Sequence, residues 1–247
     1  MKKLLFVVVL LSLYAGVYGQ EEKAANLGNR KYVFKFQPVN YALQSYSFEV
    51  ERMLNRKNAL TIGVGIPNSG SLIGKYGIEA SNDLKKLDLS TMHARLAYRH
   101  YAGHSGLPRG FYVEPYLKYQ QIKGNSTINI EGEDNLPSTY AALDGKFNTM
   151  NLGFQMGAQM MIAKRITIDF CFLGIEAGLI NGTLTGTPEN ATKIADMRSK
   201  IDDGINDLPG FLKDKLTVTN DSKSVTVKAK QLPYPWFRGG INIGIAF

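Results

Sequence analysis

The sequence predicts an all-β protein, an eight-stranded antiparallel up-and-down transmembrane β-barrel with a short amphipathic helix in its last long loop. Three observations lead to this fold class. The chain ends in a strand with one apolar face, eight segments alternate apolar and polar residues, and the connections between them alternate between short and long.

The last twelve residues form the most informative segment. Phe237 and the set Ile241, Ile243, Ile245 and Phe247 share one parity, and Arg238, Gly240 and Asn242 lie on the other. Because strand side chains alternate between faces, the segment has one apolar face and one small or polar face. In water such an edge would promote aggregation, whereas in a membrane barrel the apolar face meets lipid. We expect residues 236–247 to be the closing strand.

The first nineteen residues have the pattern of a cleavable signal peptide. Lys2 and Lys3 precede the apolar run Leu4–Leu13, and Val17-Tyr18-Gly19 resembles a cleavage site. Cleavage would leave 20–247 as one barrel domain and lower the net charge from +8 to +6. An uncleaved anchor is the alternative, although the run is short for a spanning helix. The predicted location is the cell outer membrane.

The composition narrows the classes of protein that the chain can belong to. No later apolar run approaches the ~20 residues of a spanning helix, and mean hydropathy is −0.15. Cys171 is the single cysteine, so no internal disulfide can form. The sequence has no cluster of lysine and arginine residues of the kind that indicates nucleic-acid binding. A soluble secreted barrel and a membrane barrel both remain open.

The first four expected strands are 31–37, 45–54, 59–66 and 91–101. Each has apolar residues at every second position, and Pro38 or a polar turn such as 55–58 ends the run. Their apolar faces are Tyr32, Phe34 and Phe36; Tyr46, Phe48 and Val50; Leu60, Ile62, Val64 and Ile66; and Met92, Ala94, Leu96 and Tyr98.

The last four expected strands are 110–123, 147–163, 166–180 and 236–247. The alternation falters between Leu173 and Glu176, which indicates a bulge or the membrane boundary. The apolar faces of the first three are Phe111, Val113, Pro115, Leu117 and Tyr119; Leu152, Phe154, Met156, Ala158, Met160 and Ile162; and Ile166, Ile168, Phe170 and Phe172.

The connections support the number eight. The long ones are 67–90, 124–146 and 181–235, and the short ones that alternate with them are 55–58, 102–109 and 164–165. Outer-membrane barrels have short periplasmic turns and long extracellular loops. With Phe247 at the periplasmic end, eight strands place every long connection outside, and seven would not.

The last long loop is expected to contain a helix over 188–208. Thr187-Pro188 resembles a helix start and Pro209-Gly210 a stop. Apolar residues recur between them at helical spacing, at Ile194, Met197, Ile201, Ile205 and Leu208. Packing over the rim or mouth of the barrel is favoured over a membrane-surface helix, because the polar face lacks a basic bias. Residues 222–230 are expected to extend a strand.

Parity predicts a polar interior. The inward residues are Lys35, Glu49, Glu51, Arg95, Arg99, Glu114, Lys118, Gln155, Asp169, Arg238 and Asn242, with Asn151 and Gln159 between them. Buried charges must be paired, and an eight-stranded interior has room only for side chains. We therefore expect a structural plug; a path for an ion or solute is the alternative.

No catalytic, cofactor or metal site is expected. His93 points inward, His100 outward, and His104 lies in a turn, so the three cannot converge on a metal. Ser105 beside His104 is weak support for a lipid-processing enzyme. Aromatic residues near strand ends suit an interfacial girdle, namely Tyr32, Tyr46, Tyr98, Tyr101, Tyr119, Phe147 and Phe237.

Three stretches resemble small outer-membrane barrels of Bacteroidetes, a largely uncharacterised family with OmpA/OmpX/OmpW-like architecture. Residues 45–54 with 58–65 resemble its first hairpin, 110–116 its middle strand and 238–247 its terminal strand. The resemblance implies recognition of the terminal strand by the barrel-assembly machinery during insertion. It implies no functional residue.

We therefore expect a monomer in outer-membrane lipid, with a structural or surface-interaction role and a surface or envelope partner still to be identified. The alternatives are an accessory subunit of an envelope secretion or uptake complex, a secreted lipocalin-like ligand-binding barrel, and an outer-membrane lipid-processing enzyme. Lipocalin interiors are apolar and their exteriors polar, so the polarity of the two faces separates that alternative from the first.

Overall fold

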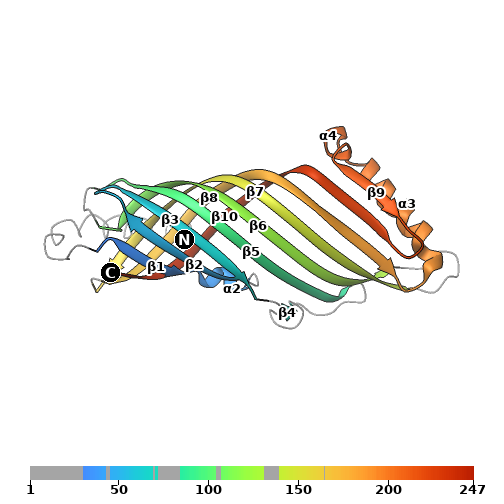
Figure 1. Ribbon diagram of the computed structural model, residues 1–247, viewed down its shortest axis with the longest axis horizontal. Helices are drawn as coiled ribbons and strands as arrows, with labels where there is room; N and C mark the ends of the chain where they lie inside the picture. The colour runs from blue at the N-terminus through green and yellow to red at the C-terminus, as the bar shows by residue number, and fades with distance from the viewer. Residues whose placement is uncertain are drawn as a thin grey trace, which may run out of the picture.

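A computed structural model describes residues 30–42, 45–68, 70–71, 84–103, 107–130, 139–163 and 165–247. The predicted signal peptide therefore lies outside the described residues. Eight strands close into a ring in chain order, and each pairs with its two neighbours in antiparallel fashion (Figure 1). The prediction of eight antiparallel strands in up-and-down order is confirmed.

The ring consists of β1 (Tyr32–Phe36), β2 (Ser45–Met53), β3 (Asn58–Pro67), β5 (Leu84–Tyr101), β6 (Gly110–Ile130), β7 (Thr139–Ile162), β8 (Ile166–Pro188) and β10 (Val225–Ala246). Outside it, β4 (Gly70–Ser71) pairs with β5, and β9 (Leu216–Asn220) pairs with β10. The helices are α2 (Pro38–Ala42), η2 (Ala191–Lys193), α3 (Ile194–Asn206) and α4 (Gly210–Lys213). None of these described helices has the length and apolar character needed to cross a membrane.

The two ends of the described chain close the ring. Val33 to Phe36 pair with Ala246 to Ile243, and Tyr32 and Phe247 exchange both backbone hydrogen bonds at 3.1 and 2.9 Å. Their rings also stack, with centroids 5.8 Å apart. The terminal strand is thus the closing strand of the ring, and its residues Ile241, Ile243, Ile245 and Phe247 point outward and are exposed.

Strand lengths differ greatly around the ring. β1, β2 and β3 have 5, 9 and 10 residues, whereas β7 and β8 have 24 and 23. The extra length lies at the end opposite Phe247, where α3, α4 and β9 also lie (Figure 1). The expected loops 67–90, 124–146 and 181–235 were therefore too long, since β5, β6, β7, β8 and β10 continue into them. The expected extension at 222–230 is confirmed for residues 225–230.

The outer face of the ring is apolar. On β7, for example, Met150, Leu152, Phe154 and Met156 point outward with 40–70% of their surface exposed. We call this surface the apolar belt. It comprises Ile62, Val64, Met92, Leu96, Tyr98, Val113, Leu117, Tyr119, Met150, Leu152, Phe154, Met156, Ile162, Ile166, Phe172, Leu173, Ile175, Leu179, Phe237, Ile241, Ile243 and Ile245.

The belt ends at a row of amides. Gln121, Asn148 and Asn181 are register partners on β6, β7 and β8, and Gln121 donates to Asn148 at 2.9 Å. Beyond this amide row the outward positions are polar, as in the next pair, Lys146 and Thr183. The strand ends beyond the row, with α3, α4 and β9, are called the projecting end.

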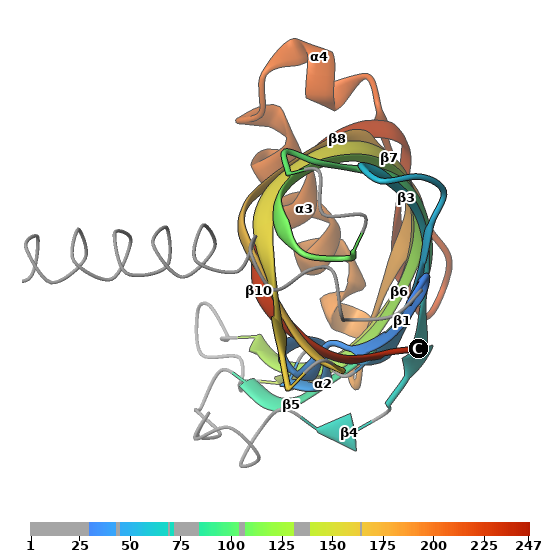
Figure 2. The same ribbon diagram turned by 90° about the vertical axis from the view of Figure 1, so that its left-hand side faces the viewer.

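The apolar side of the projecting end faces inward. Ala141 of β7, Val225 of β10, and Ile194 and Met197 of α3 form a buried cluster, with Ile128, Leu143, Ile201 and Val218 packed against it. Gly186 of β8 allows this approach, because a Cβ atom there would lie 2.3 Å from Met197 Cε. Seen end-on, α3 lies within the outline of the ring (Figure 2).

The helix differs from the expected one at its start. β8 continues through Thr187 to Pro188, so Thr187 is not its N-cap; α3 begins at Ile194 after η2. Proline is tolerated at a strand end, where its missing N–H costs no ladder bond. α3 spans 13 residues, shorter than expected, and Pro209 follows its end. The short connection after β1 contains the one-turn helix α2.

Register shifts interrupt the regular ladder at several places, and two of them, on β8 and on β10, bear on the sites described below. On β8 the register shifts at Phe172, because Met156 pairs with Leu173 but Gly157 pairs with Cys171. The expected irregularity at 173–176 therefore lies one residue earlier. On β10 a second shift lies between Ala229 and Leu232, where Gln231 has a left-handed backbone with φ 54°. The Asn181 side chain accepts the Gln231 N–H at 2.9 Å, so the amide row fixes this bulge.

Candidate functional site

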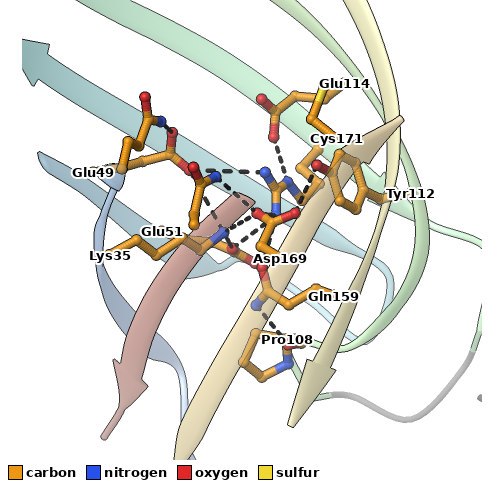
Figure 3. Close-up of polar contacts among 12 residues, drawn as sticks. Lys35, Glu49, Glu51, Pro108, Tyr112, Glu114, Gln159, Asp169 and Cys171 are labelled. Atoms are coloured by element: carbon orange, nitrogen blue, oxygen red, sulfur yellow. Dashed lines mark hydrogen bonds and ion pairs between the residues drawn. The ribbon is translucent and has the colours of Figure 1, made fainter. Parts of the chain in front are cut away.

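The inward face of the ring carries a closed set of charged side chains (Figure 3). The alternation of side chains along a strand places one or two of these charged residues on the inward face of each contributing strand, and each is at most 4% exposed. We call this set the polar network: Lys35 on β1, Glu49 and Glu51 on β2, Arg95 and Arg99 on β5, Glu114 on β6, and Asp169 on β8.

Arg99 is the centre of the polar network. Its Nη1 lies 2.9 Å from Asp169 Oδ2 and 3.2 Å from Glu51 Oε2, and its Nε donates to Glu114. Its guanidinium also lies over the Tyr112 ring at 3.7 Å from the centroid. One cation therefore joins carboxylates from three strands, which fixes those strands relative to one another.

Lys35 and Arg95 complete the ion pairs. Lys35 Nζ lies 2.5 Å from Glu51 Oε2 and 2.9 Å from Asp169 Oδ2. Arg95 donates through Nη1 to Glu114 at 2.6 Å and through Nη2 to Glu49. Three cations thus face four carboxylates, for a formal balance of −1 within the network.

Neutral donors occupy the remaining carboxylate lone pairs. Tyr101 and Tyr112 donate their hydroxyls to Glu51 and Asp169 at 2.5 and 2.7 Å. Gln155 donates to Glu114 at 2.8 Å, and Asn242 donates to Asp169 at 3.4 Å. A buried charge is costly unless it is paired and its other lone pairs are bonded. Every charge of the network is paired, and most of its carboxylate oxygens also accept a hydrogen bond. Among the described residues, Glu49 Oε1 and Arg99 Nη2 have no hydrogen-bond partner and face each other at 3.7 Å.

Glu176 is the residue that parity missed. It is 4% exposed and lies 2.6 Å from Lys118, while Tyr116 donates to it at 3.0 Å. The bulge at Phe172 shifts the parity of β8, which brings Glu176 inward. Lys118 was expected in the interior; it forms this separate pair and has no ion pair with the polar network among the described residues.

Arg238 was also expected in the network, but it lies apart. It is half-buried on β10, with its guanidinium 5.5 Å from the centroid of the Tyr116 ring. No carboxylate among the described residues lies within ion-pair distance of it. The reason is its position along the strand, since Arg238 pairs with Gly174 and Asn242, four residues further on, pairs with Asp169.

A cavity of about 390 Å³ lies on the Arg238 side of the network. Its lining joins inward residues such as His93, Lys118 and Arg238 to outward ones such as Phe237 and Ile241. Cys171, which was expected to face the interior, lines it too and donates from Sγ to Gln155 at 3.6 Å. The cavity therefore runs from the interior to the outer surface beside β10.

The two described histidines, His93 and His100, do not converge. His93 lines the cavity, and His100 points outward with its Nδ1 2.6 Å from Asn58 Oδ1. His104 and Ser105 lie outside the described residues. Within the described ranges no group of three His, Cys, Asp or Glu side chains could hold a metal.

Two of the expected girdle residues are not on the outer face. Tyr101 is 1% exposed and donates to Glu51. Phe147 precedes the outward residue Asn148 on β7 and therefore points inward; its register partner on β8 is Gly182. Tyr32, Tyr46, Tyr98, Tyr119 and Phe237 are exposed on the outer face.

No protein-family model matches the chain, and neither a curated protein nor a solved structure matches it significantly.

Proposed function

We propose that the protein is an integral outer-membrane β-barrel with a plugged lumen, whose projecting end works outside the membrane. The observation that carries the proposal is the inverted polarity of the ring. Charges are buried inside, while large apolar side chains such as Leu152 and Phe237, 70% and 74% exposed, cover the outside. Monomeric proteins in water rarely expose so continuous an apolar surface, and a membrane supplies the matching solvent.

The height of the apolar belt suits a bilayer. On β7 it runs from Met150 to Ile162, about 13 residues. At ~3.3 Å per residue and a tilt of about 45°, that length spans roughly 30 Å, the thickness of a hydrocarbon core. The amide row then lies at one interface, and the short turns and Phe247 at the other. The signal-like segment 1–19 and the resemblance to Bacteroidetes barrels agree with this placement.

The lumen has a structural role in this proposal. The polar network crosses the ring from β1 to β8 without a gap in its hydrogen bonds, which favours a plug over an ion path. The projecting end carries a helix and the short strand β9 on one side of the ring, which supports a surface-interaction role with an envelope partner. A lipocalin-like carrier needs the opposite polarity, with an apolar interior and a polar exterior.

The test uses two matched arginine substitutions on the outer face. Met156→Arg lies at mid-height in the apolar belt, and Thr183→Arg lies beyond the amide row. In a bilayer Met156→Arg should lower the free energy of unfolding by about 2–4 kcal/mol, because a charge at the midplane is costly. Thr183→Arg should change it by less than about 0.5 kcal/mol.

The readout is urea unfolding in phosphatidylcholine vesicles, followed by the mobility shift on boiling that folded barrels show in gels. Wild-type protein should also stay with membranes after carbonate washing. If salt alone releases the protein and both arginine variants are equally stable, the membrane assignment is wrong.

A further inference from the structure

The wall of the ring is incomplete beside β10. The β1–β10 ladder ends at the pair Phe36–Ile243, and α2 follows from Pro38. β10 continues for another eighteen residues on the far side of that pair, from Asn242 back to Val225, and there its strand partners are β8 and β9. The cavity reaches the outer surface along this stretch, since Phe237, Gly239 and Ile241 all line it.

The cavity is positively charged. The described residues of its lining include Arg95, Lys118 and Arg238 and no aspartate or glutamate. Glu49 and Glu114 balance Arg95, and Glu176 balances Lys118. Arg238 alone is left without a carboxylate among the described residues. A half-buried cation is costly without a counter-charge, so the site favours an anion.

The rest of the lining is apolar and aromatic. Leu89 and Ile122 line the inner part, and Tyr234 and Trp236, whose rings stack with centroids 5.8 Å apart, stand beside Arg238 on β10. A volume of about 390 Å³ lies at the low end of the ~300–1,000 Å³ of small-molecule sites. One chain with a compact headgroup fits such a volume better than a two-chain lipid.

We propose that this cavity binds a single-chain anionic amphiphile, that is, one hydrocarbon chain with a carboxylate or phosphate headgroup. Arg238 holds the headgroup, as guanidinium groups hold carboxylates and phosphates through paired N–H donors. The chain leaves beside β10, beyond the point where the β1–β10 ladder ends, and lies along the apolar belt. The position of the chain rests on the proposed function, because it requires lipid at the belt; the anion site itself does not.

Trp236 gives a direct signal, because it is the only tryptophan in the chain and it lines the cavity. Full-length protein in a nonionic detergent is titrated with 12-bromododecanoate, whose bromine quenches indole fluorescence on contact. Probes of equal chain length, 12-bromododecanol and 12-bromododecyl-trimethylammonium, control for partition into the micelle. We expect saturable quenching by the anion alone.

Two variants test the residue assignment. Arg238→Gln should weaken binding of the bromododecanoate about tenfold or more, whereas Arg165→Gln, which removes a charge at the opposite end of the ring, should leave it unchanged. Gly240→Phe is a second test that keeps every charge. A Cβ atom at Gly240 meets no atom within 4 Å, so the phenyl ring should enter the opening and block the probe.

Displacement identifies the source of the ligand. Release of the probe by dodecanoate supports a free fatty acid, and release by phosphatidylglycerol supports a membrane lipid presenting the same chemistry. Equal quenching by all three brominated probes, or an unchanged affinity in both Arg238→Gln and Gly240→Phe, would overturn the proposal. Carbonate washing of the membrane fraction from the same cells tests the membrane assignment separately, since the titration uses protein already extracted into detergent.

Discussion

Within the same strands, the ring and the projecting end have opposite polarity. On β7, the outward residue Leu152 is exposed and the inward Gln155 is buried among charges, whereas fourteen residues before Gln155 the inward residue Ala141 is buried in an apolar cluster. The switch occurs at the amide row of Gln121, Asn148 and Asn181. One continuous β-ladder therefore crosses two environments, and the solvent decides which of its faces is apolar.

The comparison teaches where stability comes from in each part. Inside the ring, ion pairs whose two charges are almost fully buried join the strands, and the buried apolar side chains form small separate clusters around Met53 and around Met161. The projecting end has an ordinary apolar core around Ile194 and Met197 and places one of its ion pairs, Arg198 with Asp202, at the surface. Equivalent substitutions should thus have unequal effects in the two parts.

The largest expected effect is in the ring. Glu114→Ala leaves the guanidinium groups of Arg95 and Arg99 without their shared carboxylate, and breaking a buried ion pair costs about 3–5 kcal/mol. Urea unfolding of the vesicle-inserted protein, followed by the gel shift, measures the loss. The matched variant is Asp202→Ala, which breaks an exposed i,i+4 pair and should cost about 0.3–0.5 kcal/mol. Similar losses in the two variants would contradict the contrast between the two parts.

Planar-bilayer conductance separates a plug from a path in the same variant. A plug predicts that Glu114→Ala is less stable, with little conductance before or after the change. Unchanged stability together with a new or altered conductance would show that the network lines a route for ions.

The alternation of residues in the sequence was sufficient to predict the ring and most of the polar network. Lys35, Glu51, Arg99 and Asp169 all have inward parity, and the structure brings them together. Parity assigns a face but not a height along the strand. That is why Arg238, which has inward parity, does not reach the network. The bulge at Phe172 resets parity on β8, and Glu176 was missed for that reason.

The projecting end could not be predicted from the same pattern. The alternation predicts that each strand ends where the outward apolar residues stop, near Leu179 on β8 and Met150 on β7. Beyond these points the strands continue with polar residues outward and small or apolar ones inward, such as Gly186 and Ala141. The inward face is apolar there only because α3 covers it, and that contact joins residues far apart in sequence.

A smaller effect is expected in the core of the projecting end. Met197→Ala removes a buried side chain from its contact with Gly186 and should destabilise α3 by about 2 kcal/mol, the low end of the range for such truncations. The loss should be local, with faster hydrogen exchange and proteolysis in 189–224 and no change in the gel shift of the ring. Ser199→Ala, exposed on the same helix, is the control. If Met197→Ala instead lowers the stability of the whole ring, seen in its gel shift, the two parts unfold as one cooperative unit.

The smallest effect is expected at the amide row itself. Asn181→Ala removes the acceptor of the Gln231 N–H, a single bond worth about 1 kcal/mol, and leaves Gln231 in a left-handed conformation that costs about 1–2 kcal/mol. The amide of Gln231 should therefore exchange faster with solvent, whereas Thr183→Ala, two residues further along the same face, should leave its exchange unchanged. Gln231→Gly in the Asn181→Ala background should restore stability, because glycine adopts this backbone without strain. If the bulge exchanges no faster without Asn181, the amide row marks the change of polarity but does not hold the bend there.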